Sequence, residues 1–328
     1  MPIMNSTTAL TVFETVQSKA VTREALMKYA FRPIDDTADE RSFGFVPFDD
    51  PYAKDVEHAW VTAIIERAHF VVFALRMDTR RIAGATLKMR VKNAMEEEKL
   101  AEGKVFISKD RKGEIKEREK LRLLSNTVPT PTYVEVVLDV IDGRIFFASV
   151  SKKAKDLFAS LWNAAFAEMP LEQTPYVLAG NDFEISGVDF LTMVRSESGY
   201  HLDDGEELNT FDIAEKAVLH SGSTAISVTT PASMVDVDKA VDVLSETIKV
   251  SKAKLQCLHD GEEFSYVLRG DDFGFTSLKT PKVDMRVAEG EDLDGPFLEK
   301  MHLLTKCVAG LHAGFKKFVK EKKANAEE

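Results

Sequence analysis

The stretch 133-YVEVVLDVIDGRIFFASV-150 decides which fold the chain can adopt. Two runs rich in β-branched and aromatic residues flank Asp142-Gly143, a dipeptide suited to the type I′ turn of a tight hairpin. Apolar residues occupy both faces of these runs, which is typical of strands inside a sheet. The sequence therefore predicts an antiparallel hairpin at the centre of a sheet.

The elements on either side of the hairpin follow from the same kind of pattern. Ser151 suits the N-cap of a helix over 152–169, whose packing face comprises Leu157, Phe158, Leu161, Trp162, Ala165 and Phe166. Upstream, the residues predict strands over 8–16, 41–48 and 70–77 and a short helix over 23–31, capped by Thr22. The beginning of the chain is thus expected to form a small α/β unit.

Residues 80–125 differ from these neighbours. From Arg80 a helical pattern places Leu87, Val91, Ala94 and Met95 on one face, and Gly103 is expected to end the helix. Residues 109–124 predict a second helix, which is highly charged and has few apolar anchors. Because so little of this segment can enter a core, we expect it to project from the body of the protein.

The C-terminal half mixes helices and strands. We expect helices over 189–197 and 235–248, a strand over 223–229, and a three-stranded meander over 252–279 with turns at 259–261 and 269–272. The last helix repeats apolar residues in a heptad-like seam, which can pack on a sheet or on a second subunit; the seam comprises Phe297, Met301, Leu304, Val308, Leu311, Phe315 and Phe318. The fold class is α+β, a multi-subdomain mixed α/β chain with antiparallel sheets flanked by helices.

Composition describes an acidic globular chain of 328 residues with a formal net charge of −11. No run is apolar and long enough to span a bilayer, and the start does not resemble a signal peptide, so a cytoplasmic protein is expected. Cys257 and Cys307 lie far apart without further cysteines, which predicts buried free thiols rather than a disulfide framework or a zinc site.

Catalytic motifs are not found. The sequence has no phosphate-binding loop, no HExxH and no GxSxG, and it predicts no cofactor, catalytic residue or metal ligand. Four acidic pairs could supply carboxylates to a two-metal nuclease, but most adjoin Gly, Pro or turns, where Asp is favoured for local hydrogen bonding; they are Asp35-Asp36, Asp49-Asp50, Asp203-Asp204 and Asp271-Asp272.

Positive charge is concentrated in one segment of this acidic chain. Residues 76–126 hold 15 Lys and Arg against 9 Asp and Glu, a local net charge of +6. Helical spacing places Arg81, Lys88, Lys92 and Lys99 on one stripe, which is either a solvated face or a set of contacts for a phosphate backbone. No aromatic residue interrupts this stripe, which favours duplex DNA over stacked single strands.

A second basic feature lies at the start of the helix after Ser151. Lys152, Lys153 and Lys155 occupy its first turn, where cations oppose the helix dipole at a cost of roughly 0.3–1 kcal/mol each. With the free backbone N–H groups they would form an anion site fit for a phosphate. The alternative is a cluster of exposed lysines without a ligand.

The order of these segments resembles the RdgC family of recombination-associated proteins, which carries the nominal description putative exonuclease. The resemblance covers nearly the whole chain and rests on 43-FGFVP-47, 116-KEREKLRLLS-125, 136-VVLDVIDGRIFFAS-149, 151-SKKAKDLFASLW-162, 187-GVDFLTMVRSE-197 and 252-KAKLQCLHDGEEFSYVL-268. It implies a homodimeric ring that encircles double-stranded DNA without sequence preference and limits access by the RecA recombinase. A nucleoid-associated protein is accordingly expected.

The resemblance also implies a division into three parts. Residues 1–77 plus 129–170 would form a centre, 78–128 a projecting helical tip and 171–328 a base. The chain departs from the family at 125–131 and 228–231, where basic and aromatic residues are replaced by Ser, Asn, Thr, Val and Pro. Two other functions stay open from the residues alone: a metal-dependent exonuclease, and a scaffold whose charged arm binds another protein.

Overall fold

The computed structural model describes residues 2–16, 20–103, 105–173, 185–197, 199–203, 208–221, 224–229, 249–284 and 294–327. The chain divides into two compact units. Unit 1 comprises Met1–Val21, Glu66–Val72 and Val134–Glu328, and unit 2 comprises Thr22–Ile65 and Phe73–Tyr133. The three-part division into centre, tip and base stays a prediction.

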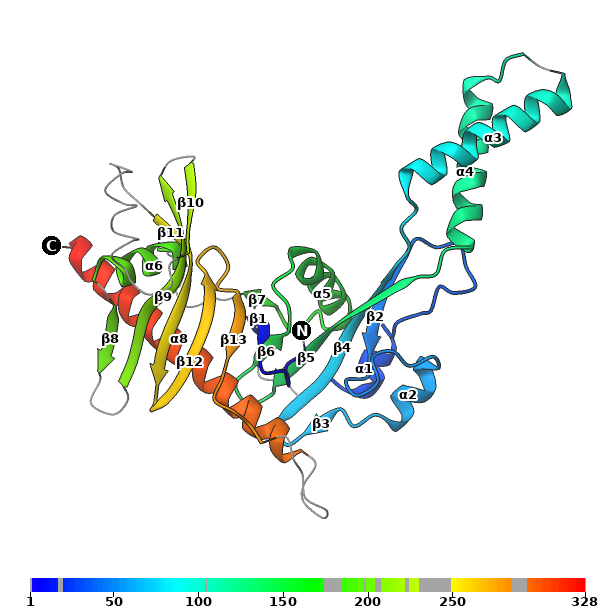
Figure 1. Cartoon of the computed structure of the whole chain (residues 1–328). Coiled ribbons are helices and arrows are strands. Elements are labelled where there is room, and N and C mark those ends of the chain that lie inside the picture. The colour runs from blue at the N-terminus through cyan, green and yellow to red at the C-terminus, as the bar shows by residue number, and fades with distance from the viewer. Residues whose placement is uncertain are drawn as a thin grey trace. The chain divides into compact units, whose positions relative to one another are not determined.

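Unit 1 is built on a large antiparallel sheet (Figure 1). Its strands follow the order β10-β9-β11-β12-β13-β1-β6-β5, and the short β7 and β8 add to β1 and β9. The bounds are β1 Thr8–Glu14, β5 Thr130–Asp139, β6 Arg144–Phe147, β7 Glu172–Gln173, β8 Tyr200–Asp203, β9 Leu208–Ser221, β10 Thr224–Thr229, β11 Lys249–His259, β12 Glu262–Arg269 and β13 Phe275–Lys279. The predicted mixed α/β fold with antiparallel sheet is therefore confirmed.

The hairpin predicted over 133–150, formed by β5 and β6, lies inside this sheet as expected. Strand β6 pairs with β1 on one side and with β5 on the other. The predicted type I′ turn is wrong. Asp139 pairs with Arg144, which leaves a four-residue loop in which only Gly143 has a positive φ, at 66°. The Asp139 carboxylate accepts hydrogen bonds from the N–H groups of Ile141 and Asp142, at 2.9 and 3.1 Å, and so stabilises the longer loop.

A true two-residue turn occurs in the predicted meander. His259 pairs with Glu262, and Asp260 and Gly261 between them have φ of 49° and 77°. Two successive positive φ angles characterise a type I′ turn, which Asp-Gly adopts at low cost. The meander itself is confirmed as β11, β12 and β13.

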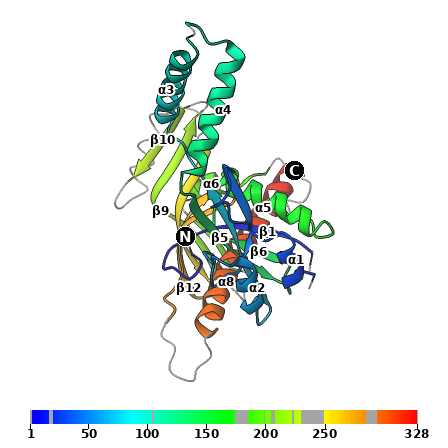
Figure 2. The same ribbon diagram turned by 90° about the vertical axis from the view of Figure 1, so that its right-hand side faces the viewer.

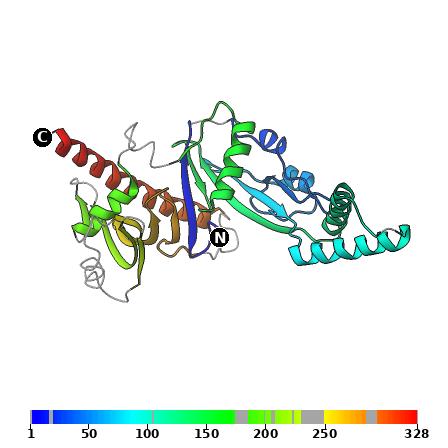
Figure 3. The same ribbon diagram turned by 90° about the horizontal axis from the view of Figure 1, so that it is seen from above.

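Three described helices pack on unit 1: α5 Lys152–Ala165, α6 Gly187–Ser196 and α8 Gly295–Glu327. Seen from above, α8 lies along one side of the strands β9 to β13 (Figure 3). All seven residues of the heptad-like seam are buried within the single chain. Packing on a sheet, the first of the two alternatives, is confirmed. The helix predicted over 235–248 lies outside the described residues.

Unit 2 pairs β2 Arg41–Val46 with the later part of β4 Phe70–Thr79 in antiparallel register. The first residues of β4 belong to unit 1 and pair with β3 Glu66–Arg67. The helices of unit 2 are α1 Arg23–Met27, α2 Val56–Thr62, α3 Gly84–Glu102 and α4 Lys109–Ser125. Helix α1 is shorter than predicted because residues 29–31 turn away to hydrogen-bond the backbone of Phe45 in β2.

Helices α3 and α4 form a hairpin with a small core of its own (Figure 2). Ala94, Ile107 and Ile115 are buried together, and Val91 and Met95 pack against them. Gly103 ends α3 with φ of 62°, as predicted. The predicted projection of residues 78–128 from the body stays a prediction.

Helix α3 begins later than predicted, at Gly84 rather than at Arg80. Residues 80–83 after β4 are not helical, and Ala83 is extended, with φ of −64° and ψ of 126°. Arg80 is 2% exposed, and its guanidinium donates hydrogen bonds to backbone carbonyls of Ile34, Asp35 and Asp39. This buried arginine fixes the loop over 34–39 and anchors the chain just before the helix.

Candidate nucleic-acid interface

Helix α3 presents fewer cations than its sequence suggested. Lys88 and Lys92 are exposed and Lys99 is half-buried, and their spacing puts all three on one edge of the helix. Arg81 is exposed but lies before the helix, so its predicted place on the helical stripe is wrong. Lys92 pairs with Glu96 at 3.8 Å, with both side chains largely in water.

Much of the positive charge around α3 is already compensated. Arg76 is 9% exposed and makes two hydrogen bonds of 2.9 Å to the buried carboxylate of Asp78. Arg111 lies between Glu98 and Glu114, with contacts of 2.6 Å to each, and these hydrogen bonds raise the pKa of its guanidinium. The local net charge of +6 therefore overstates the charge available to a ligand.

The first turn of α5 separates its three lysines into two groups. Lys152 and Lys153 are exposed, whereas the Lys155 side chain is only 11% exposed. The Lys155 ammonium donates hydrogen bonds to a carboxylate oxygen of Asp272, at 2.7 Å, and to Gln173, at 3.4 Å. Lys155 is thus occupied within the protein, and its predicted role as a phosphate ligand is not supported by this geometry.

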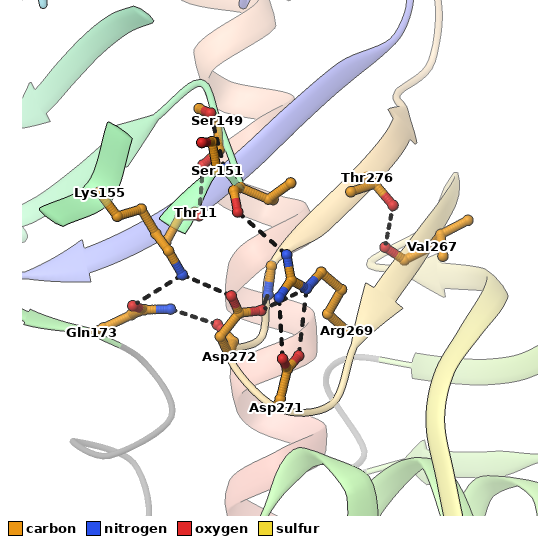
Figure 4. A network of polar contacts seen from close by, with 12 residues as sticks. Thr11, Ser149, Ser151, Lys155, Gln173, Val267, Arg269, Asp271, Asp272 and Thr276 are labelled. Carbon is orange, nitrogen blue, oxygen red and sulfur yellow. Dashed lines mark hydrogen bonds and ion pairs between the residues drawn. The ribbon is translucent and has the colours of Figure 1, made fainter. Parts of the chain in front are cut away.

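Figure 4 shows how Lys155 and Arg269 converge on Asp272 from different elements. Arg269, at the end of β12, approaches the other oxygen of Asp272 to 3.2 Å, and the Gly274 N–H donates to the same oxygen at 3.0 Å. Gln173 of β7 donates to the Asp272 carbonyl at 2.8 Å. The network joins α5, β7 and the loop between β12 and β13.

Asp271 completes the charge balance of this network. It accepts hydrogen bonds from Arg269 at 3.1 and 3.4 Å. Burial by itself raises the pKa of Asp271, but the hydrogen bonds and positive charge of Arg269 outweigh burial and lower it overall. Two cations and two anions offset each other here, so the exposed charge at the start of α5 comes from Lys152 and Lys153.

The two helices that carry these lysines begin differently from four other helices. In α1, α2, α4 and α6 a side chain accepts a hydrogen bond from a first-turn N–H group, and an acidic residue follows in the first turn. In α3 and α5 the N-cap side chain accepts no such bond, and the first turn contains no acidic residue. The N-termini of α3 and α5 thus retain N–H groups and dipole charge that attract anions.

Other chemically interesting residues are mostly buried. Cys257 and Cys307 are buried free thiols, as predicted, and burial raises the pKa of both. Burial lowers the pKa of His259 to about 4. Among the residues that the structure describes, no group of three or more His, Cys, Asp and Glu could hold a metal ion, and no helix is long and apolar enough to cross a membrane.

Comparison with known proteins adds no assignment, because no protein-family model and no curated protein matches the chain.

The sequence did not predict the residues that Lys155 contacts. Asp272 lies 117 residues away and Gln173 lies 18 residues away. No local sequence pattern indicates a contact over such a separation. The sequence did show the acidic pair Asp271-Asp272 beside Arg269 in a predicted turn.

Proposed function

We propose that the protein binds double-stranded DNA without sequence preference, through phosphate contacts at α3 and at the start of α5. The observation that carries the proposal is the start of α5, where the exposed Lys152 and Lys153 lie in an uncapped first turn free of acidic residues. Helix α3 has a similar uncapped start, and its exposed Lys88 and Lys92 follow in the second and third turns. Lysines and free N–H groups together favour phosphate over other anions of lower charge. The residues that would contact phosphates are Lys88, Lys92, Lys152 and Lys153. The half-buried Lys99 would contribute less.

The resemblance to the RdgC family extends this proposal to a homodimeric ring around duplex DNA that restricts access by the RecA recombinase. Three apolar side chains around the turn between α3 and α4 are strongly exposed: Leu100 at 85%, Val105 at 93% and Phe106 at 72%. Exposed apolar groups clustered within seven residues favour contact with another protein surface. They support a role for this turn in pairing two copies of the chain.

A salt titration of duplex binding tests the proposal. The logarithm of the association constant should fall linearly with that of the salt concentration, by about 0.9 per phosphate contacted. Changing Lys88, Lys92, Lys152 and Lys153 together to Ala should lower that slope by up to about 3.6. Alanine is a strong helix former, so the variant should fold.

A matched control removes the same charge elsewhere. Lys316, Lys320, Lys322 and Lys323 are exposed near the end of α8. Their joint replacement by Ala should leave the salt slope close to that of the original protein. Equal slopes in both variants would contradict the chosen residues, and absence of duplex binding at low salt would contradict the function itself.

Two simple assays distinguish DNA binding from the two other functions, an exonuclease and a protein scaffold. Loss of labelled linear DNA on incubation with Mg²⁺ or Mn²⁺ would favour a metal-dependent exonuclease, whereas a binding protein leaves the DNA intact. Binding to a protein partner with no measurable affinity for DNA would favour a scaffold.

A further inference from the structure

Unit 1 contains two adjoining pockets whose linings include none of the lysines discussed above. One has a volume of about 280 Å³ and the other about 320 Å³, and both are lined by Ala68, His69, Phe70 and Ile141. Each is near the lower end of the roughly 300–1,000 Å³ typical of small-molecule sites. From their lining we propose that together they bind a small organic cation, a protonated primary amine on a short aliphatic chain.

The larger pocket supplies the carboxylate that would hold the ammonium group. The carboxylate of Asp139 lines it with only 4% of the side chain exposed. One oxygen of this carboxylate accepts hydrogen bonds from the loop N–H groups of Ile141 and Asp142. The other oxygen lies 3.7 Å from Nε2 of His69, which is too far for a good hydrogen bond. This second oxygen can therefore accept a hydrogen bond from a ligand.

Thr305 of α8 gives an independent indication of a missing polar partner. It lines the same pocket, and its hydroxyl oxygen is buried without a hydrogen-bond partner among the described residues. A buried polar atom left unpaired costs roughly 1–3 kcal/mol, so such atoms normally find a partner. An ammonium group has three N–H donors, which could bond the second oxygen of Asp139 and, after rotation of its side chain, the hydroxyl of Thr305.

The charge of the lining selects a cation. Asp139 and Asp142 line the larger pocket and Glu66 lines the smaller one, while no Lys or Arg is found among the described lining residues of either. The nearby guanidinium of Arg67 lies 3.4 Å from Asp294 and above the ring of Phe297. An anionic ligand would be repelled by these carboxylates, of which Asp142 also pairs with Arg144 at 3.4 Å; His69 and His302 complete the polar lining of the larger pocket.

The smaller pocket supplies the apolar end. Its walls include Val21, Phe70, Val71, Val140 and Ile141, of which Ile141 is 58% exposed. Val21, Phe70 and Val71 are already buried, so an aliphatic chain attached to the ammonium group would remove from water mainly the surface of Ile141 and of the half-buried Val140. The two ends together match an amphipathic amine rather than an inorganic cation.

The turn between β3 and β4 places His69 between the two ends. Arg67 pairs with Phe70, and the connecting Ala68 has a φ of 54°. This conformation suits glycine and costs a residue with a side chain of order 1 kcal/mol. The strained turn holds the imidazole beside Asp139 at the junction of the pockets.

Three probes of equal length test the proposal on the full chain. Calorimetric titration should detect hexylamine, and should show hexanol and hexanoate binding at least about 10-fold more weakly, as expected for loss of a charged hydrogen bond. Asp139→Asn keeps an acceptor for the loop but removes the charge, and should weaken hexylamine binding by a similar factor. Thr305→Val should weaken it by a smaller factor.

Asp212→Asn provides a matched control, since Asp212 lies at a different pocket of unit 1. It should bind hexylamine as the original protein does. Because Asp139→Asn could also perturb the loop, NMR shifts of His69 and Ile141 on addition of hexylamine to the original protein serve as a second measurement. Any of three results would overturn the proposal. They are equal affinity for hexylamine and hexanol, unchanged hexylamine binding in both Asp139→Asn and Thr305→Val, and NMR shifts confined to residues outside the pockets.

Discussion

At the scale of single residues, Lys155 shows how the protein itself can take up a charge that its sequence offers to a ligand. Its ammonium group is held by Asp272 at 2.7 Å in a mostly buried position. Lys153, two residues earlier, faces solvent. The two lysines therefore have different roles, one in stability and the other in the proposed contact with DNA.

Lys155→Met should destabilise the protein by about 1–3 kcal/mol, because it keeps the apolar stem but removes a charged hydrogen bond and a partner of Asp272. Lys153→Met is the control and should change the free energy of unfolding by less than about 0.5 kcal/mol. Urea denaturation at pH 7 measures both. Equal stability of the two variants would show that the Lys155 contact contributes nothing.

Two buried histidines predict a pH dependence of stability. Burial lowers the pKa of His259 to about 4, and burial together with Arg144 and Lys316 lowers that of His312 to about 3. Since an unfolded histidine titrates near 6.5, the unfolded chain binds more protons below that pH. The stability that these groups contribute is fully present above pH 6.5 and is lost progressively as the pH falls toward 4.

The measurement is the free energy of unfolding at pH 7 and pH 5. It should be lower at pH 5, and His312→Gln should reduce the difference because one of the two protonation events is removed. His58→Gln, at an exposed position of α2, is the control and should keep the difference. An unchanged pH dependence in His312→Gln would contradict the contribution assigned to this residue.

At the scale of elements, glycines decide how closely α8 approaches the sheet. A Cβ on Gly310 would lie 2.4 Å from the ring of His259, and one on Gly314 would lie 2.5 Å from the ring of Phe211. Both distances are far shorter than a van der Waals contact. The helix can pack at its present depth only with glycine at these positions.

Gly310→Ala should accordingly destabilise the protein by about 1–3 kcal/mol through overpacking. Gly113 of α4 is the matched control, because nothing lies within 4 Å of the position of its added Cβ. Gly113→Ala should stabilise the protein by roughly 0.5–1 kcal/mol through helix propensity. Thermal unfolding compares the two, and a stabilised Gly310→Ala variant would contradict the close packing of α8.

At the scale of the whole molecule, the proposed ring predicts a particular association with DNA. The protein should have the mass of a dimer in solution, and it should load more slowly on closed circular than on linear duplex, because a ring must open to enclose a circle. Sedimentation and DNA-binding kinetics measure these properties. A monomer, or equal loading on both substrates, would contradict the ring.

A variant tests the place of the turn between α3 and α4 in that ring. If two contacts close the ring, replacing Leu100, Val105 and Phe106 by Ser should open one contact. The variant should then load equally on circular and linear DNA while a dimer persists. Replacing the exposed Val61 of α2 and the exposed Ile64 just after this helix by Ser is the control and should keep the difference in loading.

Local chemistry in the sequence predicted most of the described elements. The strand composition of 133–150, Thr22 as an N-cap, Gly103 as a C-cap and the seam of α8 each depend on neighbours within a few residues. Sequence did less well where a distant group intervenes. Arg80 bonds to a loop more than forty residues earlier, which delays the start of α3 to Gly84.

The sequence by itself determined that this is an α+β chain with an antiparallel sheet, an amphipathic final helix and segregated positive charge, because periodicity and composition are local properties. Only the tertiary structure decided which charges remain available. Arg76, Arg111 and Lys155 are compensated by carboxylates, whereas Lys88, Lys152 and Lys153 are exposed. The physical reason is that an ion pair depends on distance and burial in space. Folding sets these even for near neighbours such as Arg76 and Asp78, and it brings together Lys155 and Asp272, which are 117 residues apart along the chain.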